Sequence, residues 1–168
     1  MIKKDIRSLS LEDLRTFFLD KGFQAFRGNQ VYEWLWKKSL KDIDQMTNIS
    51  KDIRDILKSE FVINYIEIES VQKSSDGTVK NAIKLHDGLT VESVLIPTKT
   101  RMTACISSQV GCSLNCKFCA TARLKRMRNL NPDEIYDQVV TINSQCLEFH
   151  NKPLTNIVFM GMGEPLMN

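Results

Sequence analysis

Apolar side chains recur every three or four positions through the first part of the chain, which predicts short amphipathic helices. Ser10 is expected to begin a capping box, and Gly22 to end the helix that follows it. A second helix is expected to open at Gly28, and a third to be capped by Ser50. The short connections between these helices predict a small helical domain over residues 1–60.

The apolar pattern changes to a period of two after Phe61, which indicates β-strands. Asp76–Gly77 and His86–Gly88 are turn signals between strands, and Pro97 is expected to end the last of them. Three antiparallel strands in a meander are therefore expected over residues 61–98.

The final part of the chain, residues 99–168, has a third pattern. A short apolar strand over Thr103–Ser107 is followed by a cysteine-rich loop over Gly111–Asn129. A helix is expected to start at Asn131, and another strand covers Leu154–Met160. A strand, helix and strand in this order form a βαβ unit, so the expected fold class is α/β. Two strands and one helix cannot cover both faces of a parallel sheet, so this layer is expected to be truncated.

Composition adds few constraints, because 42% apolar and 26% charged residues are ordinary for a globular chain. No apolar run approaches the ~20 residues that span a bilayer, and the N-terminus does not resemble a signal peptide. A cytoplasmic location without a membrane partner is therefore expected. Residues 117–128 carry five basic side chains and no acid, so they could contact phosphate or form a solvated basic loop.

Three of the five cysteines, Cys112, Cys116 and Cys119, lie within eight residues of one another. An odd number of cysteines argues against a disulfide framework. The short spacings let one loop bring three thiolates to one iron–sulfur cluster and leave one iron open. A structural zinc site is the alternative, but it usually needs paired cysteines or histidines, and only His86 and His150 are available.

The three-then-two spacing, with Phe118 just before the third cysteine, resembles the signature of the radical S-adenosylmethionine (SAM) superfamily. Further motifs resemble the dual-specificity 23S rRNA and tRNA adenine carbon-2 methyltransferases, the RlmN family. In chain order, the matching segments are Phe26–Trp34, Val91–Pro97, Cys105–Cys112, Phe118–Thr121, Arg128–Leu130 and Asn156–Leu166. They cover nearly the whole chain. Thr121–Arg128 departs from the family pattern by being more basic and poorer in glycine.

The resemblance implies a helical accessory RNA-binding domain at 1–60, an antiparallel β extension at 61–98 and the first part of a radical SAM partial (β/α) barrel at 99–168. It implies a 4Fe–4S cluster on the three clustered cysteines and SAM as the second cofactor. The implied partners are 23S rRNA, tRNA and an electron donor such as flavodoxin. We expect a monomer.

The resemblance also implies roles for individual residues. Gly163 and Glu164 match the turn that grips the methionine end of SAM, although by themselves they resemble an ordinary Gly-Pro turn. Glu92 matches a proton acceptor, whereas the period-two pattern alone indicates a surface acid. Cys105 matches the cysteine that resolves the RNA–enzyme adduct by forming a disulfide with a methyl-carrying cysteine, which is expected outside this chain. Cys146 lies at helical spacing on an apolar face and is expected in the core.

Side chains in the helical region are candidates for RNA contact, because RNA recognition joins positive charge with aromatic stacking. Arg27, Gln30, Trp34 and Trp36 belong to this group. Helical spacing favours a core position for Trp34, so Arg27 and Lys37 are the better phosphate ligands.

Two alternatives to the adenine carbon-2 methyltransferase are open. One is an adenine carbon-8 rRNA methyltransferase of the same superfamily. The other is a non-catalytic RNA-binding fragment with a structural zinc site, which would bind RNA with a steep salt dependence and hold no iron. On either enzymatic interpretation, the 168-residue chain alone is expected to be inactive.

Overall fold

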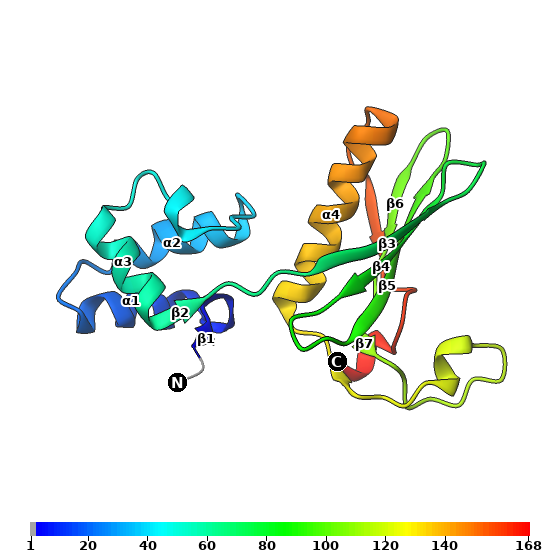
Figure 1. The fold of residues 1–168 in the computed structure, drawn as a ribbon, viewed down its shortest axis with the longest axis horizontal. Coiled ribbons are helices and arrows are strands. Elements are labelled where there is room, and N and C mark those ends of the chain that lie inside the picture. Colours follow the sequence, from blue (N-terminus) through cyan, green and yellow to red (C-terminus); the bar gives the residue numbers. More distant parts are fainter. Residues whose placement is uncertain (1–2) are drawn as a thin grey trace. The chain divides into compact units, whose positions relative to one another are not determined.

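A computed structural model describes residues 3–168 and divides the chain into two compact units, Met1–Asn64 and Tyr65–Asn168 (Figure 1). Each unit has its own apolar core.

The first unit combines three α-helices with two short 3-10 turns and a pair of two-residue strands. In chain order these are β1 (Lys4–Asp5), η1 (Ile6–Ser8), α1 (Leu11–Asp20), α2 (Phe26–Trp36), η2 (Ile43–Gln45), α3 (Lys51–Glu60) and β2 (Phe61–Val62). Strands β1 and β2 pair in parallel and bring the two ends of the unit together. Leu14, Phe18, Val31, Leu35 and Leu57 are among the buried side chains of its core.

The helix signals in the sequence are confirmed with two corrections. The capping box is present, because the Asp13 amide donates to Ser10 Oγ at 3.1 Å and the Ser10 amide donates to the Asp13 carboxylate at 2.8 Å. Helix α2 begins at Phe26, two residues before the expected Gly28. A Cβ atom on Gly28 would lie 2.8 Å from the backbone of α1, so this glycine permits close helix packing. Ser50 is the N-cap of α3, but its side chain makes no capping hydrogen bond.

The second unit contains a five-stranded sheet, one long helix and a separate two-stranded ladder. In chain order its elements are β3 (Glu67–Lys73), β4 (Val79–Lys84), β5 (Thr90–Pro97), β6 (Met102–Cys105), β7 (Gln109–Val110), η3 (Ala120–Arg123), β8 (Arg128–Asn129), α4 (Pro132–His150), β9 (Asn156–Val158) and η4 (Pro165–Met167). The sheet order is β3-β4-β5-β6-β9, and β7 pairs with β8. Neighbouring strands are antiparallel from β3 to β6, whereas β6 and β9 are parallel.

This topology confirms a mixed α/β fold and shows that the meander and the βαβ unit share one continuous sheet. The turn signals are confirmed, because Gly77 and Gly88 both adopt positive φ between paired strands. The position of the first meander strand was wrong. The first strand was expected to start at Phe61. Instead, Phe61–Val62 form β2 in the first unit, and β3 starts only at Glu67, where pairing with β4 across the Gly77 turn begins.

Helix α4 covers one face of the sheet (Figure 1). Val79, Leu95 and Ala104 on the strands pack with Ile142 and Cys146 on the helix, so the core position expected for Cys146 is confirmed. The buried amides of Asn81 on β4 and Gln145 on α4 also pair across this interface. No helix among residues 3–168 has both the length and the apolar character that a membrane crossing requires.

Candidate active site

Glu92 and Cys105 lie on the face of the sheet opposite α4. Along β5 the side chains of Ser93 and Leu95 are buried toward the helix, so Glu92 points to the other face. Val94 also points away from the helix, and it pairs with Cys105 across the antiparallel β5–β6 ladder. Paired residues share a face, and therefore two residues far apart in the chain are brought to one side of the sheet.

The Glu92 side chain is accessible and pairs with a lysine. Its Oε1 atom lies 3.0 Å from Lys80 Nζ, and half of the Glu92 side chain is exposed. An exposed ion pair of this kind contributes only about 0–1 kcal/mol. The surface position expected from periodicity is confirmed, and the carboxylate can reach a molecule outside the sheet.

Cys105 is the last residue of β6 and is only 8% exposed. Burial raises the pKa of its thiol, and a backbone hydrogen bond with Met160 partly opposes that rise. The thiol is therefore mainly protonated at neutral pH and needs a local change to become a thiolate.

The residues after Cys105 run beside the last turn of the chain. The Gly161 amide donates to the Ile106 carbonyl oxygen at 3.0 Å. The Ser108 amide donates to the Met162 carbonyl oxygen at 2.9 Å. These backbone hydrogen bonds hold the turn that contains Gly163 against the end of β6.

Ser107 joins this turn to the strand that carries Glu92. Its hydroxyl donates to the Glu92 carbonyl oxygen at 2.5 Å and accepts from the Met162 amide at 2.8 Å. Its own amide donates to the Gln138 side chain of α4 at 2.8 Å. Through its hydroxyl and its backbone amide, one fully buried residue therefore joins three elements. No pattern in the sequence indicates this role for Ser107.

A glycine is required at position 163, because the turn packs closely against Gln109. Its φ is +99°, and a Cβ atom there would lie 2.5 Å from the Cβ atom of Gln109. Glu164 follows as the N-cap of η4, and its carboxylate accepts a hydrogen bond from the Leu166 amide at 3.1 Å. In the structure, the close contact that Gly163 permits is therefore with Gln109 of the same chain.

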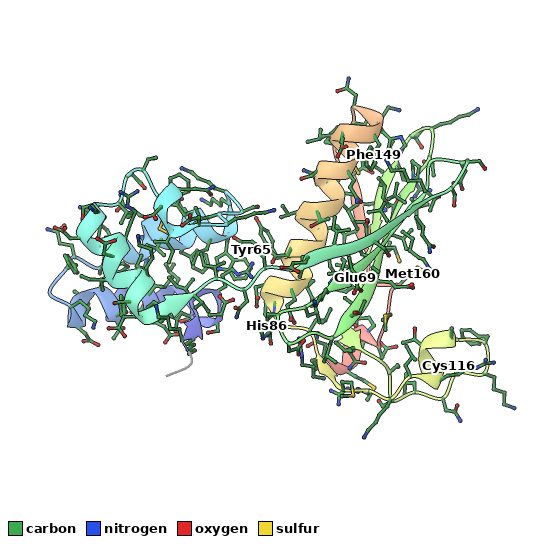
Figure 2. The ribbon with its side chains drawn as sticks, viewed as in Figure 1. Tyr65, Glu69, His86, Cys116, Phe149 and Met160 are labelled. Atoms are coloured by element: carbon green, nitrogen blue, oxygen red, sulfur yellow. The ribbon has the colours of Figure 1, made fainter. Side chains whose placement is uncertain are left out.

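The three clustered cysteines lie on a loop that projects from the second unit, where Figure 2 labels Cys116. The β7–β8 ladder closes the base of this loop. All five cysteines of the chain are free. The pKa of the Cys119 thiol is lowered, first by a backbone hydrogen bond with Ala122, and this favours the thiolate. Cys112 Sγ accepts a hydrogen bond from the Leu114 amide at 3.4 Å.

Within residues 3–168 no three Cys, His, Asp or Glu side chains are arranged to hold a metal ion. The donor set nevertheless fits an iron–sulfur cluster in its chemistry. Cys112, Cys116 and Cys119 share one loop, each is partly exposed, and neither acids nor histidines lie between them. Ligation would require the loop to draw these sulfur atoms together.

Arg128 fastens the returning strand of the cysteine loop to the rest of the unit. Its guanidinium donates to both carboxylate oxygens of Glu134 at 2.7 and 2.8 Å, and to Asp87 at 2.7 Å. The hydrogen bonds with Glu134 are the main cause of a raised Arg128 pKa. Glu134 also accepts from the Asn131 amide at the start of α4, at 2.8 Å. This network was not identified from the sequence.

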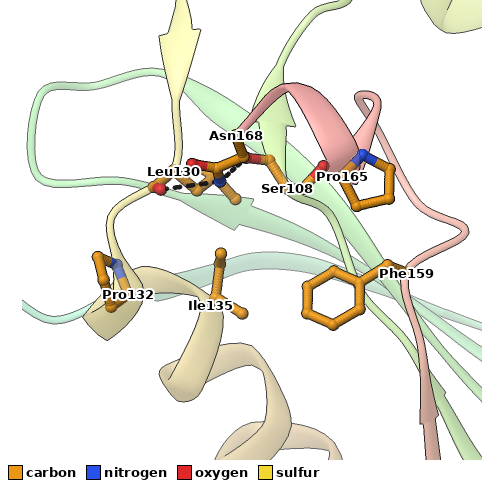
Figure 3. A pocket seen from close by; sticks show the side chains of 7 residues that line it. All are labelled: Ser108, Leu130, Pro132, Ile135, Phe159, Pro165 and Asn168. Atoms are coloured by element: carbon orange, nitrogen blue, oxygen red, sulfur yellow. Dashed lines mark hydrogen bonds between the residues drawn. The ribbon is translucent and has the colours of Figure 1, made fainter.

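A largely apolar cavity of about 430 Å³ lies near the Gly163 turn (Figure 3). It is lined by Ser108, Leu130, Pro132, Ile135, Phe159, Pro165 and Asn168. The Asn168 side-chain amide donates to the carbonyl oxygens of Ser108 and Leu130, at 2.7 and 3.1 Å. These contacts hold the described end of the chain against the loop that leads into α4.

The candidate RNA ligands of the first unit mostly contact one another or the core. Arg27 donates to Gln30 Oε1 at 2.9 Å, and Lys37 pairs with a glutamate one turn earlier on α2. Trp34 is partly buried against the core, as its spacing predicted. Lys38 Nζ lies 3.6 Å from the centre of the Trp34 ring, so an exposed cation and an aromatic ring adjoin there.

Comparison with known proteins shows which family this chain resembles. The family model for the ribosomal RNA large subunit methyltransferase N-terminal domain matches residues 4–63. A probable dual-specificity RNA methyltransferase RlmN of Christiangramia forsetii is 68% identical over 166 residues, which are 99% of this chain and 47% of that protein. The chain belongs to the RlmN family. A dual-specificity RNA methyltransferase RlmN of Geotalea uraniireducens is 44% identical over the full chain and 47% of its own length.

A solved structure agrees with the family assignment. The crystal structure of a radical SAM methyltransferase from Sphaerobacter thermophilus matches with a TM-score of 0.83 and 34% identity. The match covers 98% of this chain and 48% of that one. The chain thus spans about half the length of the RlmN relatives it matches. The resemblance seen in the sequence is confirmed, while the roles of individual site residues stay predictions.

Proposed function

We propose that this chain is part of a radical SAM methyltransferase that methylates carbon 2 of adenosine in 23S rRNA and tRNA through a methyl-cysteine intermediate. One observation carries the proposal: a loop with three free cysteines adjoins the Gly163 turn in a chain that is 68% identical to an RlmN relative. The loop follows β6 and the turn follows β9, which are parallel strands, so both lie at their carboxyl ends. Barrel enzymes hold their sites at that edge.

In this proposal Cys112, Cys116 and Cys119 hold the 4Fe–4S cluster, and Gly163 and Glu164 hold SAM. When bound, the cluster supplies the electron that cleaves SAM to a 5′-deoxyadenosyl radical. The protein contributes thiolate ligands, and the lowered pKa of the Cys119 thiol favours the ligating form. A partly exposed carboxylate at Glu164 can pair with the ammonium group of SAM.

Glu92 and Cys105 perform the later steps of the proposed reaction. The Glu92 carboxylate accepts the proton that leaves carbon 2 of the adenine ring, and its half-exposed position supports this role. The Cys105 thiolate then attacks the sulfur of the methyl-carrying cysteine, which we place outside residues 1–168. A disulfide forms as the carbon–sulfur bond to the RNA breaks, its electron pair stays on the carbon, and a proton completes the methyl group.

Phosphate contacts with the RNA are proposed for Arg27 and Lys37 in the first unit. Arg27 lies on α2 and is held by Gln30, while Lys37 is the C-cap residue just after α2 and is held by an exposed ion pair that phosphate can replace. An electron donor such as flavodoxin, a monomeric state and a cytoplasmic location complete the proposal.

The deciding experiment is anaerobic reconstitution of the full-length protein with iron and sulfide. We expect visible iron–sulfur absorption and a reduced-state electron paramagnetic resonance (EPR) signal that SAM perturbs. Cys116→Ala should abolish both, whereas Cys146→Ala changes a buried core cysteine and should retain them. Stoichiometric zinc in place of iron would contradict the proposal and favour a zinc-containing RNA-binding protein.

A product assay then identifies the carbon that is methylated. RNA carrying deuterium at carbon 2 of adenosine should lose that deuterium on methylation, because Glu92 removes the ring proton. RNA deuterated at carbon 8 should retain it. The reverse result would assign the adenine carbon-8 reaction instead.

A further inference from the structure

The buried amide of Gln109 joins the two segments that the proposed function assigns to the cofactors. Its Oε1 atom accepts a hydrogen bond from the Glu164 amide at 3.0 Å. Its Nε2 atom donates to Asn129 Oδ1 at 2.9 Å and to the Met167 carbonyl oxygen at 3.3 Å. Gln109 is fully buried and lies three residues before Cys112. One side chain thus contacts both the SAM-binding turn and the base of the cysteine loop.

On the side of the turn, packing reinforces the hydrogen bond. A Cβ atom on Gly163 would lie 2.5 Å from Gln109 Cβ and 2.8 Å from its Cγ, so the Gly163 backbone rests on this side chain. A displaced Gln109 would leave the turn without that support. The partly buried Glu164 amide would also lose its hydrogen-bond acceptor.

On the side of the loop, Gln109 is tied to the returning strand. Gln109 and Asn129 are Cα partners in the β7–β8 ladder, and their side chains are also hydrogen bonded. Asn129 Oδ1 accepts a second hydrogen bond from Arg126 at 2.7 Å. A movement of the cysteine loop would therefore displace Gln109 through both its backbone pairing and its side-chain hydrogen bond.

We propose that Gln109 is a positioning residue that holds the SAM-binding turn in register with the cluster-binding loop. This inference rests on the proposed function and adds a residue that does not itself touch either cofactor. The buried amides Asn81 and Gln145 provide the contrast. They pair through hydrogen bonds of 3.0 and 2.7 Å between β4 and α4, without contacting the turn or the loop.

Three variants of the full-length protein test this role. Gln109→Leu removes all three side-chain hydrogen bonds, whereas Gln109→Glu keeps an acceptor for the Glu164 amide and loses the amide donors. Gln145→Leu breaks a buried amide pair elsewhere in the same unit and is the matched control for general destabilisation. For each variant we would measure iron content, the melting temperature and the SAM concentration that half-perturbs the reduced-cluster EPR signal.

We expect Gln109→Leu to retain iron close to the wild-type level but to need about tenfold more SAM, which corresponds to about 1.4 kcal/mol. Gln109→Glu should recover part of that loss. Gln145→Leu should lower the melting temperature without changing the SAM response. If Gln109→Leu needs no more SAM than wild type does, or if Gln145→Leu needs as much more SAM as Gln109→Leu, the positioning role is wrong.

Hydrogen exchange on the cluster-free protein separates this inference from the proposed function. Gln109→Leu should speed exchange of the Glu164 amide and of the amides in residues 126–129 together, while Gln145→Leu changes neither. If the wild type binds no cluster, the proposed function fails and exchange still decides whether Gln109 couples the segments. Faster exchange at the Glu164 amide alone, or at residues 126–129 alone, would show that Gln109 does not couple the two segments.

Discussion

Arg128 and Glu134 form a bidentate ion pair at the base of the cysteine loop, with hydrogen bonds of 2.7 and 2.8 Å. The Glu134 side chain is only 3% exposed, and Arg128 compensates its negative charge. Removing one member of a buried pair leaves an uncompensated charge, which makes the site vulnerable to substitution.

Arg128→Ala should therefore lower the free energy of unfolding by about 3 kcal/mol, the lower end of the range for broken buried pairs because Arg128 is partly exposed. Urea unfolding of the full-length protein would measure the change. Lys125→Ala, an exposed basic residue in the same loop, should alter stability by less than about 0.5 kcal/mol. Equal losses for the two variants would refute the importance of the Glu134 contact.

Gly163→Ala should disrupt the turn, because its φ of +99° is unfavourable for alanine and the new Cβ would collide with Gln109. Gly88→Ala is the matched control, with a φ of +81° and no heavy atom within 4 Å of the added Cβ. The control should cost only the backbone strain, about 1–2 kcal/mol. Gly163→Ala should cost more and should also weaken the EPR response to SAM. A similar melting temperature for both variants would show that the collision is relieved.

Ser107→Ala should lower the free energy of unfolding by about 1–3 kcal/mol, because the partly buried Met162 amide loses the fully buried Ser107 hydroxyl as its acceptor. Ser144→Ala removes an exposed hydroxyl that donates to its own helix at 3.0 Å, and should be nearly neutral. Chemical unfolding curves for both variants would give the comparison. Near-equal curves would mean that another group replaces the Ser107 hydroxyl.

Alkylation by iodoacetamide at neutral pH should modify Cys119 before Cys105 and Cys146. The lowered pKa of the Cys119 thiol increases its thiolate fraction at a given pH, whereas burial raises the pKa of the other two and decreases theirs. Raising the pH should narrow the difference as the buried thiols ionise. Mass spectrometry of peptides after timed quenching of the cluster-free protein would test the order, and early labelling of Cys105 would contradict it.

Glu92→Gln should leave the free energy of unfolding within about 1 kcal/mol of wild type, because its ion pair with Lys80 is exposed. In the full-length protein the same variant should stop methylation, since an amide cannot accept the ring proton. Lys80→Ala is the control for loss of the ion pair alone and should retain methylation. Normal turnover by Glu92→Gln would assign the base elsewhere.

The predictions that held from sequence depended on short-range chemistry. The Ser10 capping box and the turns at Gly77 and Gly88 involve residues within a few positions of one another, so local propensity determines them. The helical spacing of Cys146 likewise places it in the core without reference to the rest of the chain. The spacing of the clustered cysteines and the flanking motifs were sufficient to identify the family.

The predictions that failed depended on contacts between separate secondary-structure elements. The first meander strand was misplaced because its position is set by pairing with β4, and the start of α2 because Gly28 serves packing rather than helix initiation. The sequence by itself determined the local elements, the family and the candidate ligands. Only the tertiary structure placed Glu92 and Cys105 on one face of the sheet and set Ser107 and Gln109 against the Gly163 turn. The strand register and the partly buried hydrogen bonds join residues 11 to 55 positions apart, and no local pattern records them.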